Sequence, residues 1–222
     1  MNAAKKRVQI RQIQTTMENL RKNRMEAYYV KTAADVPAQV ETLLHEGDVV
    51  AVDGSITLEE AGVLSLLRCG KYRFLDRYAP GLTAEQVRQV YIDSFSADAY
   101  LCSANAVTMN GELYNVDGNS NRVAAICYGP RSVILVVGCN KLVPDLKAAV
   151  QRVRLTAAPA NAVRLHCATY CASAGVCQGM EKGELTAGCG TDARICCNYV
   201  VSARQREAGR IKVILVGEPL GY

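Results

Sequence analysis

Six of the ten cysteines crowd into a single segment of the chain, residues 167–197. Thiols stay reduced in the cytosol, where clustered cysteines more often bind a metal or take part in redox chemistry than form structural disulfides. The other four lie singly in apolar surroundings, so we expect small core residues at Cys69, Cys102, Cys127 and Cys139. The cluster is therefore the first candidate site, and ordinary reduced thiols in a loose segment are its alternative.

A second candidate site follows the short apolar strand 49–52. In an open parallel sheet, ligands bind beyond the carboxyl ends of the strands, where loops and helix N-termini present free N–H groups. Gly54 lets the backbone approach a ligand, Ser55 and Thr57 supply hydroxyls, and the start of the next helix favours an anion. The structural alternative is a capping box between Thr57 and Glu60.

A third candidate is the polar stretch 105–130, which is richer in polar side chains than a turn requires. Such a cluster at the end of buried strands can bind a carboxylate, a phosphate or a sugar. The alternative is that Asn and Asp fill turns by bonding to their own backbone. The polar residues of this stretch are Asn105, Asn110, Asn115, Asp117, Asn119, Asn121 and Arg122.

Strands alternate with helices along the chain, which predicts an α/β fold with a mainly parallel sheet and helices on both faces. We expect strands at 26–30, 48–52, 73–75, 99–102, 123–127, 132–138 and 211–217, and helices at 5–26, 35–45, 57–69, 83–94 and 145–155. A single domain is expected over residues 1–222. It would comprise an N-terminal helix (1–26), an α/β core (27–165), a cysteine-rich segment (166–200) and a closing strand (201–222).

The composition favours a globular protein, since half of the residues are apolar and 21% are charged. No run is apolar enough to span a bilayer, and the N-terminus lacks the apolar centre of a signal peptide, so we expect a cytoplasmic protein. The net charge is +5, yet residues 1–31 hold eight Lys and Arg against two Glu. The basicity therefore belongs to one segment and predicts neither a nucleic-acid-binding face nor a membrane partner.

The N-terminal segment 5–26 places Ile10, Ile13, Met17 and Leu20 at helical spacing, with charged residues on the other face. An apolar stripe of this kind requires burial. We expect this amphipathic helix to pack on the domain or on a second subunit, which leaves a homo-oligomer open.

The strings DGSITLEEAG and NAVTMNGELYNVDGNSNRVAAICYGPRSVILVVGCNKLV resemble the hallmark stretch of LUD-domain proteins, many of which are named lactate utilisation proteins. The NVDG-x-x-NRVA string is the most specific part. The opening helix followed by YYV and the closing KVILVGEPLGY are similar too, so the resemblance covers nearly the whole chain. It implies the fold of the NagB/RpiA/CoA-transferase-like superfamily, in agreement with the predicted sheet.

The resemblance also implies that residues of the second and third candidates form one functional cleft. With Thr57 from the turn, the predicted ligand-binding set is Gly54, Ser55, Thr57, Glu59, Asn105, Asp117, Gly118, Asn121 and Arg122. CoA transferases use a glutamate that precedes Asn-Gly, whereas Met109 precedes Asn110-Gly111 here. A covalent CoA-ester mechanism is therefore not expected.

Some LUD-domain proteins carry a C-x5-C-x2-C-x6-C pattern that ends in Arg-Ile-Cys-Asn, and the cysteine segment is similar to it. The resemblance implies a metal site at Cys171, Cys177, Cys189 and Cys196, although eleven residues instead of two separate the middle pair. Four thiolates without histidine suit an iron–sulfur cluster or, alternatively, a structural zinc ion. Cys167 and Cys197 would be spare thiols.

These features together predict a bacterial lactate utilisation protein, a subunit or accessory factor in the oxidation of lactate to pyruvate. It would bind a small anion in the α/β cleft and work with iron–sulfur subunits of lactate oxidation. One alternative is a stand-alone enzyme of the sugar-phosphate isomerase or cyclo-ligase type, and another is a metal-stabilised interaction module without catalysis. Whether the chain is itself an enzyme stays open.

Overall fold

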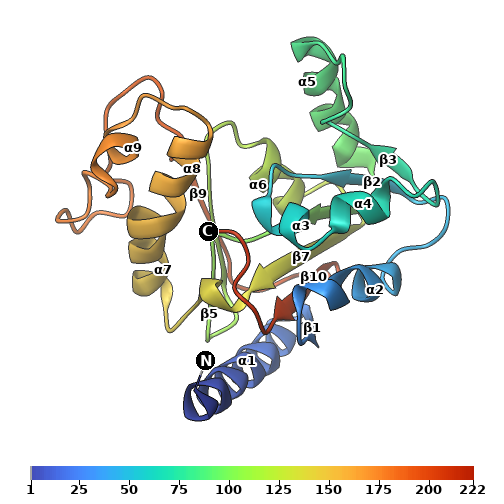
Figure 1. The fold of residues 1–222 in the computed structure, drawn as a ribbon, viewed down its shortest axis with the longest axis horizontal. Helices are drawn as coiled ribbons and strands as arrows, with labels where there is room; N and C mark the ends of the chain where they lie inside the picture. Colours follow the sequence, from blue (N-terminus) through green and yellow to red (C-terminus); the bar gives the residue numbers. More distant parts are fainter. Residues whose placement is uncertain (1) are drawn as a thin grey trace.

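A six-stranded parallel sheet forms the centre of the computed structural model, which describes residues 2–222 (Figure 1). The strands lie in the order β1-β10-β7-β4-β2-β3, and every neighbouring pair is parallel. Their bounds are Glu26–Val30 (β1), Val49–Val52 (β2), Arg73–Leu75 (β3), Ala99–Cys102 (β4), Ser132–Gly138 (β7) and Ile211–Val216 (β10). The predicted α/β class with a mainly parallel sheet is confirmed.

The unbroken apolar runs of β7 and β10 place these strands at the centre of the sheet, where both faces are covered. Successive side chains of a strand point to opposite faces. Val133 and Leu135 accordingly lie in one hydrophobic cluster, and Ile134 and Val136 lie in the other. The first face is covered by α1 (Ala3–Lys22) and α6 (Asn121–Cys127), and the second by α2 (Val36–Glu41), α3 (Ile56–Glu60) and α4 (Val63–Leu67).

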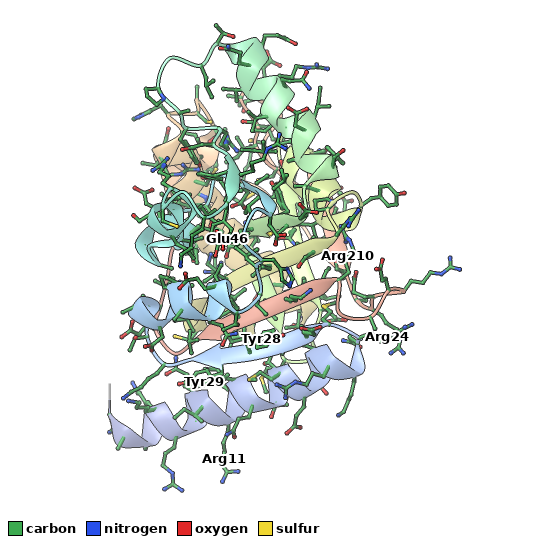
Figure 2. The ribbon with its side chains drawn as sticks, turned by 90° about the vertical axis from the view of Figure 1, so that its right-hand side faces the viewer. Arg11, Arg24, Tyr28, Tyr29, Glu46 and Arg210 are labelled. Carbon is green, nitrogen blue, oxygen red and sulfur yellow. The ribbon has the colours of Figure 1, made fainter. Side chains whose placement is uncertain are left out.

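The N-terminal helix α1 packs against the sheet with its apolar stripe, as predicted. Ile13 and Leu20 are buried in the first cluster, while Arg11 points away from the sheet (Figure 2). The Asn19 side chain donates a hydrogen bond to the carbonyl of Met109, which fastens the helix to a turn far along the chain. α1 is therefore a packing element of the domain.

A second sheet of four short strands, which the sequence did not indicate, stands beside the first. Its order is β8-β5-β6-β9, with β5 and β6 joined as a hairpin through a turn at Asn110-Gly111. β9 pairs antiparallel with β6 along its whole length, from Leu113 opposite Ser202 to Asp117 opposite Asn198. The strand bounds are Ala106–Thr108 (β5), Leu113–Asp117 (β6), Leu142–Val143 (β8) and Asn198–Ser202 (β9).

Helical segments pack on this second sheet and carry the chain toward the cysteines (Figure 1). Asp145 caps α7 by accepting a hydrogen bond from the backbone N–H of Ala148. The last turn before Pro159 widens into a π-helix, which suits a proline that has no N–H to donate. The bounds are Leu146–Arg152 (α7), Val153–Ala157 (η4), Ala158–Arg164 (α8) and Tyr170–Ala174 (α9).

Two predicted elements were wrong. Residues 123–127 form helix α6 and not a strand, because a short apolar run does not by itself distinguish a strand from a buried helix. The predicted helix 57–69 is broken at Gly62, which adopts a positive φ of 70° between α3 and α4. Ser55 takes the N-cap position of α3, so the capping box expected at Thr57 and Glu60 does not form.

The remaining elements lie at the periphery of the main sheet. Helix α5 (Ala84–Asp93) projects from it in Figure 1, and Thr83 and Gln86 form a capping box at its start. Short 3-10 turns occur at Ala33–Asp35 (η1), Ser94–Ser96 (η2) and Cys139–Lys141 (η3). None of the helices within residues 2–222 combines the length and the apolar character needed to cross a membrane.

Candidate functional site

The candidate site is a cavity of about 250 Å³ beyond the carboxyl ends of β2 and β4. These strands are parallel neighbours, so the loops that follow them, at Asp53 and Ser103, meet at one edge of the sheet. The carboxyl end of β6 supplies another wall through Asp117 and Gly118. We call this cavity the polar cleft.

Eight of the nine residues in the predicted ligand-binding set line the polar cleft. Glu59 does not, because it lies on the exposed side of the short helix α3. The eight residues are Gly54, Ser55, Thr57, Asn105, Asp117, Gly118, Asn121 and Arg122.

The Arg122 guanidinium lies at the centre of a network that joins the walls of the cleft. Its Nη1 donates to the Ser103 carbonyl at 3.1 Å and to the Asn115 Oδ1 at 2.7 Å. Its Nη2 donates to the Asn105 Oδ1 and to the Val116 carbonyl, both at 2.9 Å. Arg122 thereby connects the strand-end loop after β4 to the strand β6.

The remaining donor of Arg122, Nε, faces two carboxylates. It lies 3.4 Å from the Asp117 Oδ2 and 3.8 Å from the Asp53 Oδ2. A guanidinium has five N–H groups, so protein acceptors already surround all of them. Arg122 consequently connects the walls of the cleft and lies beside both of its carboxylates, so the other cations of the cleft remain to contact a ligand.

Two buried polar atoms beside this network have no hydrogen-bond partner in the described part of the chain: the Asp53 Oδ1 and the Asn115 Nδ2. Asp53 lines the cleft, whereas Asn115 lies behind it. Buried polar groups are satisfied in most folded proteins, and exceptions concentrate at functional sites. The open acceptor on Asp53 therefore marks the position where a ligand or water would complete the network.

Lys141 is the most unusual residue of the cleft, and the sequence reasoning missed it. It is 3% exposed, and its ammonium donates to the Thr57 Oγ1 at 2.7 Å and to the Ser103 Oγ at 3.0 Å. A charged lysine has three N–H groups, so one remains for a ligand. The available signal was its place three residues after the end of β7, a central buried strand.

The pKa values of Asp53 and Lys141 approach each other inside the cleft. Burial raises the pKa of Asp53 to about 6, against the opposing effects of Arg122 and Lys141. Burial, together with the neighbouring positive charge of Arg152, lowers the pKa of Lys141 to about 7. An acid and a base that both titrate near neutral pH in one cleft can exchange protons with a ligand.

Arg77 supplies the second cation that sequence reasoning missed. Its guanidinium lies over the rings of Tyr78 and Tyr91, with centroid distances of 5.2 Å and 4.7 Å. A methyl group added at Gly54 would lie 3.6 Å from the Arg77 Nη1, so the guanidinium sits beside the turn after β2. Aromatic stacking positions Arg77 while leaving its N–H edge for an anion.

The C-terminal residues lie across one side of the cleft. Tyr222 lines the cavity, and its hydroxyl donates to the Asn161 Oδ1 at 3.4 Å. Gly221 approaches Thr57 so closely that an added Cβ would lie 2.5 Å from its hydroxyl, and its φ is +54°. Only glycine combines this close contact with that backbone conformation.

A second, much smaller cavity of about 20 Å³ is lined by all four predicted metal ligands, Cys171, Cys177, Cys189 and Cys196. We call it the cysteine cavity. The spare thiols Cys167 and Cys197 do not line it. The segment therefore brings together the four cysteines despite the eleven residues between the middle pair.

Two arginines hold the cysteine segment in shape through its backbone. The buried Arg154 guanidinium donates to the carbonyls of Lys182, Glu184, Leu185 and Ala187. Arg194 donates to the carbonyls of Cys189 at 3.1 Å and Cys196 at 2.8 Å. Side-chain donors thus replace the regular hydrogen bonding that this loop lacks.

The thiols differ in their surroundings. Burial, with a smaller contribution from the nearby thiols of Cys171 and Cys177, raises the pKa of Cys196 to about 12. Burial has the same effect on Cys189, but hydrogen bonds from Thr191 outweigh it and lower the pKa of that thiol. Within residues 2–222 no three His, Cys, Asp or Glu side chains are already arranged to hold a metal ion.

The two cavities share a wall, because Arg194 and Ile195 line both of them. The backbone N–H of Cys197 donates to the Asp117 carbonyl at 3.0 Å, and the Asn198 side chain donates to the Gly118 carbonyl. The end of the cysteine segment is thereby bonded to the floor of the polar cleft.

Comparison with family models shows the family of the chain. A family model described as the LUD domain matches residues 13–216. A solved structure of a DUF162 family protein from Deinococcus radiodurans is 17% identical with a TM-score of 0.49, and the match covers 95% of this chain and 98% of that chain. The eIF2B beta structure from Chaetomium thermophilum is 20% identical with a TM-score of 0.35, over 51% of this chain and 43% of that chain. No curated protein matches the sequence.

Proposed function

The chain belongs to the LUD-domain family, whose function is of the lactate-utilisation type, and we propose that its polar cleft binds lactate or pyruvate. The observation that carries this proposal is the buried Lys141, which shares one cavity with the open carboxylate oxygen of Asp53. In this proposal the protein acts as a subunit or accessory factor in the oxidation of lactate to pyruvate. Its partners would be iron–sulfur subunits of that reaction.

The charges of the cleft favour an anion. Four cationic side chains line it, Arg77, Arg122, Lys141 and Arg194, against the two carboxylates Asp53 and Asp117. Two positive charges therefore remain when all of these groups are ionised. A small ligand with one carboxylate would neutralise part of that excess, and charge-assisted hydrogen bonds are the strong ones.

The size of the cleft favours a small metabolite. Its volume of about 250 Å³ lies below the roughly 300–1,000 Å³ of pockets that enclose drug-sized ligands. The lining is rich in amides and hydroxyls, with Ser55, Asn105, Asn119 and Asn121 around it. Such a lining suits a compact molecule with several oxygen atoms.

Lactate and pyruvate differ at the oxygen on their second carbon, and Asp53 offers a means to accept both. As a carboxylate, Asp53 accepts a hydrogen bond from the hydroxyl of lactate. When protonated, it donates to the carbonyl of pyruvate. A pKa of about 6 keeps both forms accessible near neutral pH, while the third N–H of Lys141 and the guanidinium of Arg77 bind the ligand's carboxylate.

Calorimetry tests the proposal. Wild-type protein is titrated at pH 6.5 with pyruvate, lactate, inorganic phosphate and ribose 5-phosphate. We expect pyruvate or lactate to bind and the Lys141→Met variant to lose most of this affinity. The matched control is Lys147→Met, which removes an exposed lysine from α7 and should bind as the wild type does.

Two results would contradict the proposal. Binding of ribose 5-phosphate in preference to both carboxylates would favour an isomerase-like enzyme. Absence of binding by all four compounds would separate the cleft from small-anion recognition.

A further inference from the structure

The hydrogen bonds around Lys141 have a fixed direction. The Ser103 hydroxyl donates its proton to the Val136 carbonyl at 2.7 Å. The Thr57 hydroxyl likewise donates its proton to the Leu220 carbonyl at 3.4 Å. A hydroxyl has one proton and two lone pairs, so both hydroxyls can only accept from the Lys141 nitrogen, which lies 2.7 Å from one and 3.0 Å from the other. Two N–H groups of Lys141 are therefore committed to these hydroxyls.

The remaining tetrahedral position of this nitrogen is open. Within residues 2–222 the two hydroxyls are its hydrogen-bond partners, and Lys141 lines the polar cleft. In the charged lysine this position holds the third N–H, which can bind a carboxylate. In the neutral lysine both N–H groups still donate to the hydroxyls, so the position holds the lone pair. The structure thus directs a nucleophilic lone pair to the place where an anion would bind.

We propose that Lys141 forms an imine with the carbonyl carbon of a small 2-oxo acid such as pyruvate. The inference rests on the proposed function, since it requires that the cleft bind this class of ligand. The carbonyl carbon of pyruvate is bonded to its carboxylate, so an anion held beside Lys141 presents that carbon to the same nitrogen. Lactate has no carbonyl group at this carbon and is bound without reaction. The cleft therefore distinguishes the two acids by covalent chemistry.

Burial supplies the neutral amine that this reaction requires. Lys141 is 3% exposed, and burial together with the charge of Arg152 lowers its pKa to about 7. A substantial share of the side chain consequently lacks its extra proton at neutral pH. Lysines that are desolvated in this way are the ones that form Schiff bases with carbonyl substrates.

Asp53 can carry the protons of the reaction. Its Oδ1 is buried without a hydrogen-bond partner among the described residues, and burial raises its pKa to about 6. As the amine forms a bond to the carbonyl carbon, the carbon–oxygen π bond breaks and the oxygen takes the proton of Asp53. The Asp53 carboxylate then takes a proton from the nitrogen and passes it to the new hydroxyl, which leaves as water. The products are a protonated imine, water and ionised Asp53, and no atom is oxidised or reduced.

Reductive trapping tests the inference. Wild-type protein is incubated at pH 7 with pyruvate and sodium cyanoborohydride, which reduces an imine to a stable amine. We expect one adduct per chain that adds about 72 Da, the mass of pyruvic acid and two hydrogens less one water. Peptide mapping should place the adduct on Lys141, with the exposed Lys147 of the same chain unmodified as the internal control. Lactate in place of pyruvate should give no adduct.

A matched pair of variants at Thr57 tests the direction of the lone pair. Thr57→Val keeps the shape of the side chain but removes its hydroxyl, so one N–H of the amine loses its acceptor and the lone pair is no longer fixed. The rate of trapping should fall roughly tenfold or more. Thr57→Ser keeps the hydroxyl and should retain most of the wild-type rate. Circular dichroism checks that both variants are folded.

Three outcomes would overturn the inference, and calorimetry with pyruvate separates them from a failure of the proposed function. Pyruvate that binds without forming an adduct would leave a noncovalent site. An adduct as abundant on Lys147 as on Lys141 would show an unspecific reaction. Equal trapping rates in Thr57→Val and Thr57→Ser would remove the hydrogen bonds as the device that directs the amine. Absence of both binding and adduct would contradict the proposed function as well.

Discussion

The polar cleft and the cysteine cavity are each organised by one arginine, but they are built from different kinds of structure. Arg122 connects the ends of strands in the two sheets, with β4 and β6 on either side. Arg194 connects backbone carbonyls of a segment whose only helix is the five-residue α9. The cleft thus rests on the hydrogen-bonded core, and the cavity rests on side chains that bind a loop.

Because of this difference, we expect the polar cleft to be preorganised and the order of the cysteine cavity to depend more on a bound ligand. Strand ends in a packed sheet keep their positions whether or not a ligand is bound, because opening them disrupts the core. A loop fixed by a few side-chain hydrogen bonds opens locally at a lower free energy. We therefore expect changes in the cleft to affect global stability or ligand affinity, and changes around the cavity to affect local order.

The largest effect is expected from Arg122→Ala. The substitution leaves the carboxylates of Asp53 and Asp117 without their shared cation, and the Oδ1 of Asn115 without a donor. Removing one partner of a buried charge network typically costs about 3–5 kcal/mol. Urea denaturation should show a loss of this size in the free energy of unfolding.

The control is Arg77→Ala, which should change the free energy of unfolding by less than about 1 kcal/mol, because Arg77 contacts tyrosine rings at the rim of the cleft. If the two variants proved equally stable, Arg122 would not be the residue that organises the cleft.

Arg194→Ala should act locally. It removes charge-assisted hydrogen bonds to the carbonyls of Cys189 and Cys196, which contribute on the order of 1.5–3 kcal/mol each when well formed. Since Arg194 is partly exposed, we expect the opening free energy of the segment to fall by about 2–3 kcal/mol. Hydrogen exchange around residues 186–197 should accelerate, while amides of β7 keep their protection. Loss of protection throughout β7 would show that the segment is part of the global folding unit.

Much of the fold follows from patterns in the sequence. Burial could be predicted directly from the apolar runs of β7 and β10 and from the amphipathic stripe of α1. Helix α6 was predicted as a strand because the apolar run VAAIC is too short to show the 3.6-residue period of a helix. The second sheet was missed because β5 and β8 have three and two residues, and their pairing depends on contacts distant in sequence.

Site residues that belong to a sequence motif could be predicted. Residues whose role depends on burial in the folded chain could not. The resemblance pointed to seven residues that line the cleft, and the turn after β2 added Thr57. Lys141 escaped notice because its partner Thr57 lies 84 positions away and its burial exists only in the folded chain. Arg122 was expected to bind the anion, but a sequence does not show that its donors are already occupied.

The ligand affinity of Arg77→Ala tests whether Arg77 contacts the ligand, in contrast to Arg122, which stabilises the cleft. We expect the affinity for pyruvate to fall about thirtyfold, which corresponds to about 2 kcal/mol for one charge-assisted interaction. Arg77→Lys should recover part of this loss, since it keeps the charge without the planar fork. Calorimetry at pH 6.5 measures both variants. An unchanged dissociation constant for Arg77→Ala would assign the carboxylate to Lys141 alone.

The smallest effect is a pH dependence that originates in the cleft. Carboxylate binding requires the charged form of Lys141, whose pKa in the free protein is lowered to about 7. Affinity is therefore complete well below pH 7 and falls tenfold per pH unit above it, or about tenfold between pH 6 and pH 8. Deprotonation of Asp53, whose pKa is raised to about 6, adds repulsion in the lower part of this range.

Calorimetric titrations with pyruvate at pH 6, 7 and 8 measure this slope, with Lys147→Met as the control that should reproduce it. An Asp53→Asn variant should retain the decline between pH 7 and 8, because that part belongs to the lysine. The protonation of Lys141 also affects the free energy of unfolding, but with the opposite dependence on pH. The unfolded chain binds it up to pH 10.5, so the contribution of Lys141 to stability falls as pH is lowered from about 10.5 to 7. A pyruvate affinity independent of pH would show that the bound anion does not meet the Lys141 ammonium.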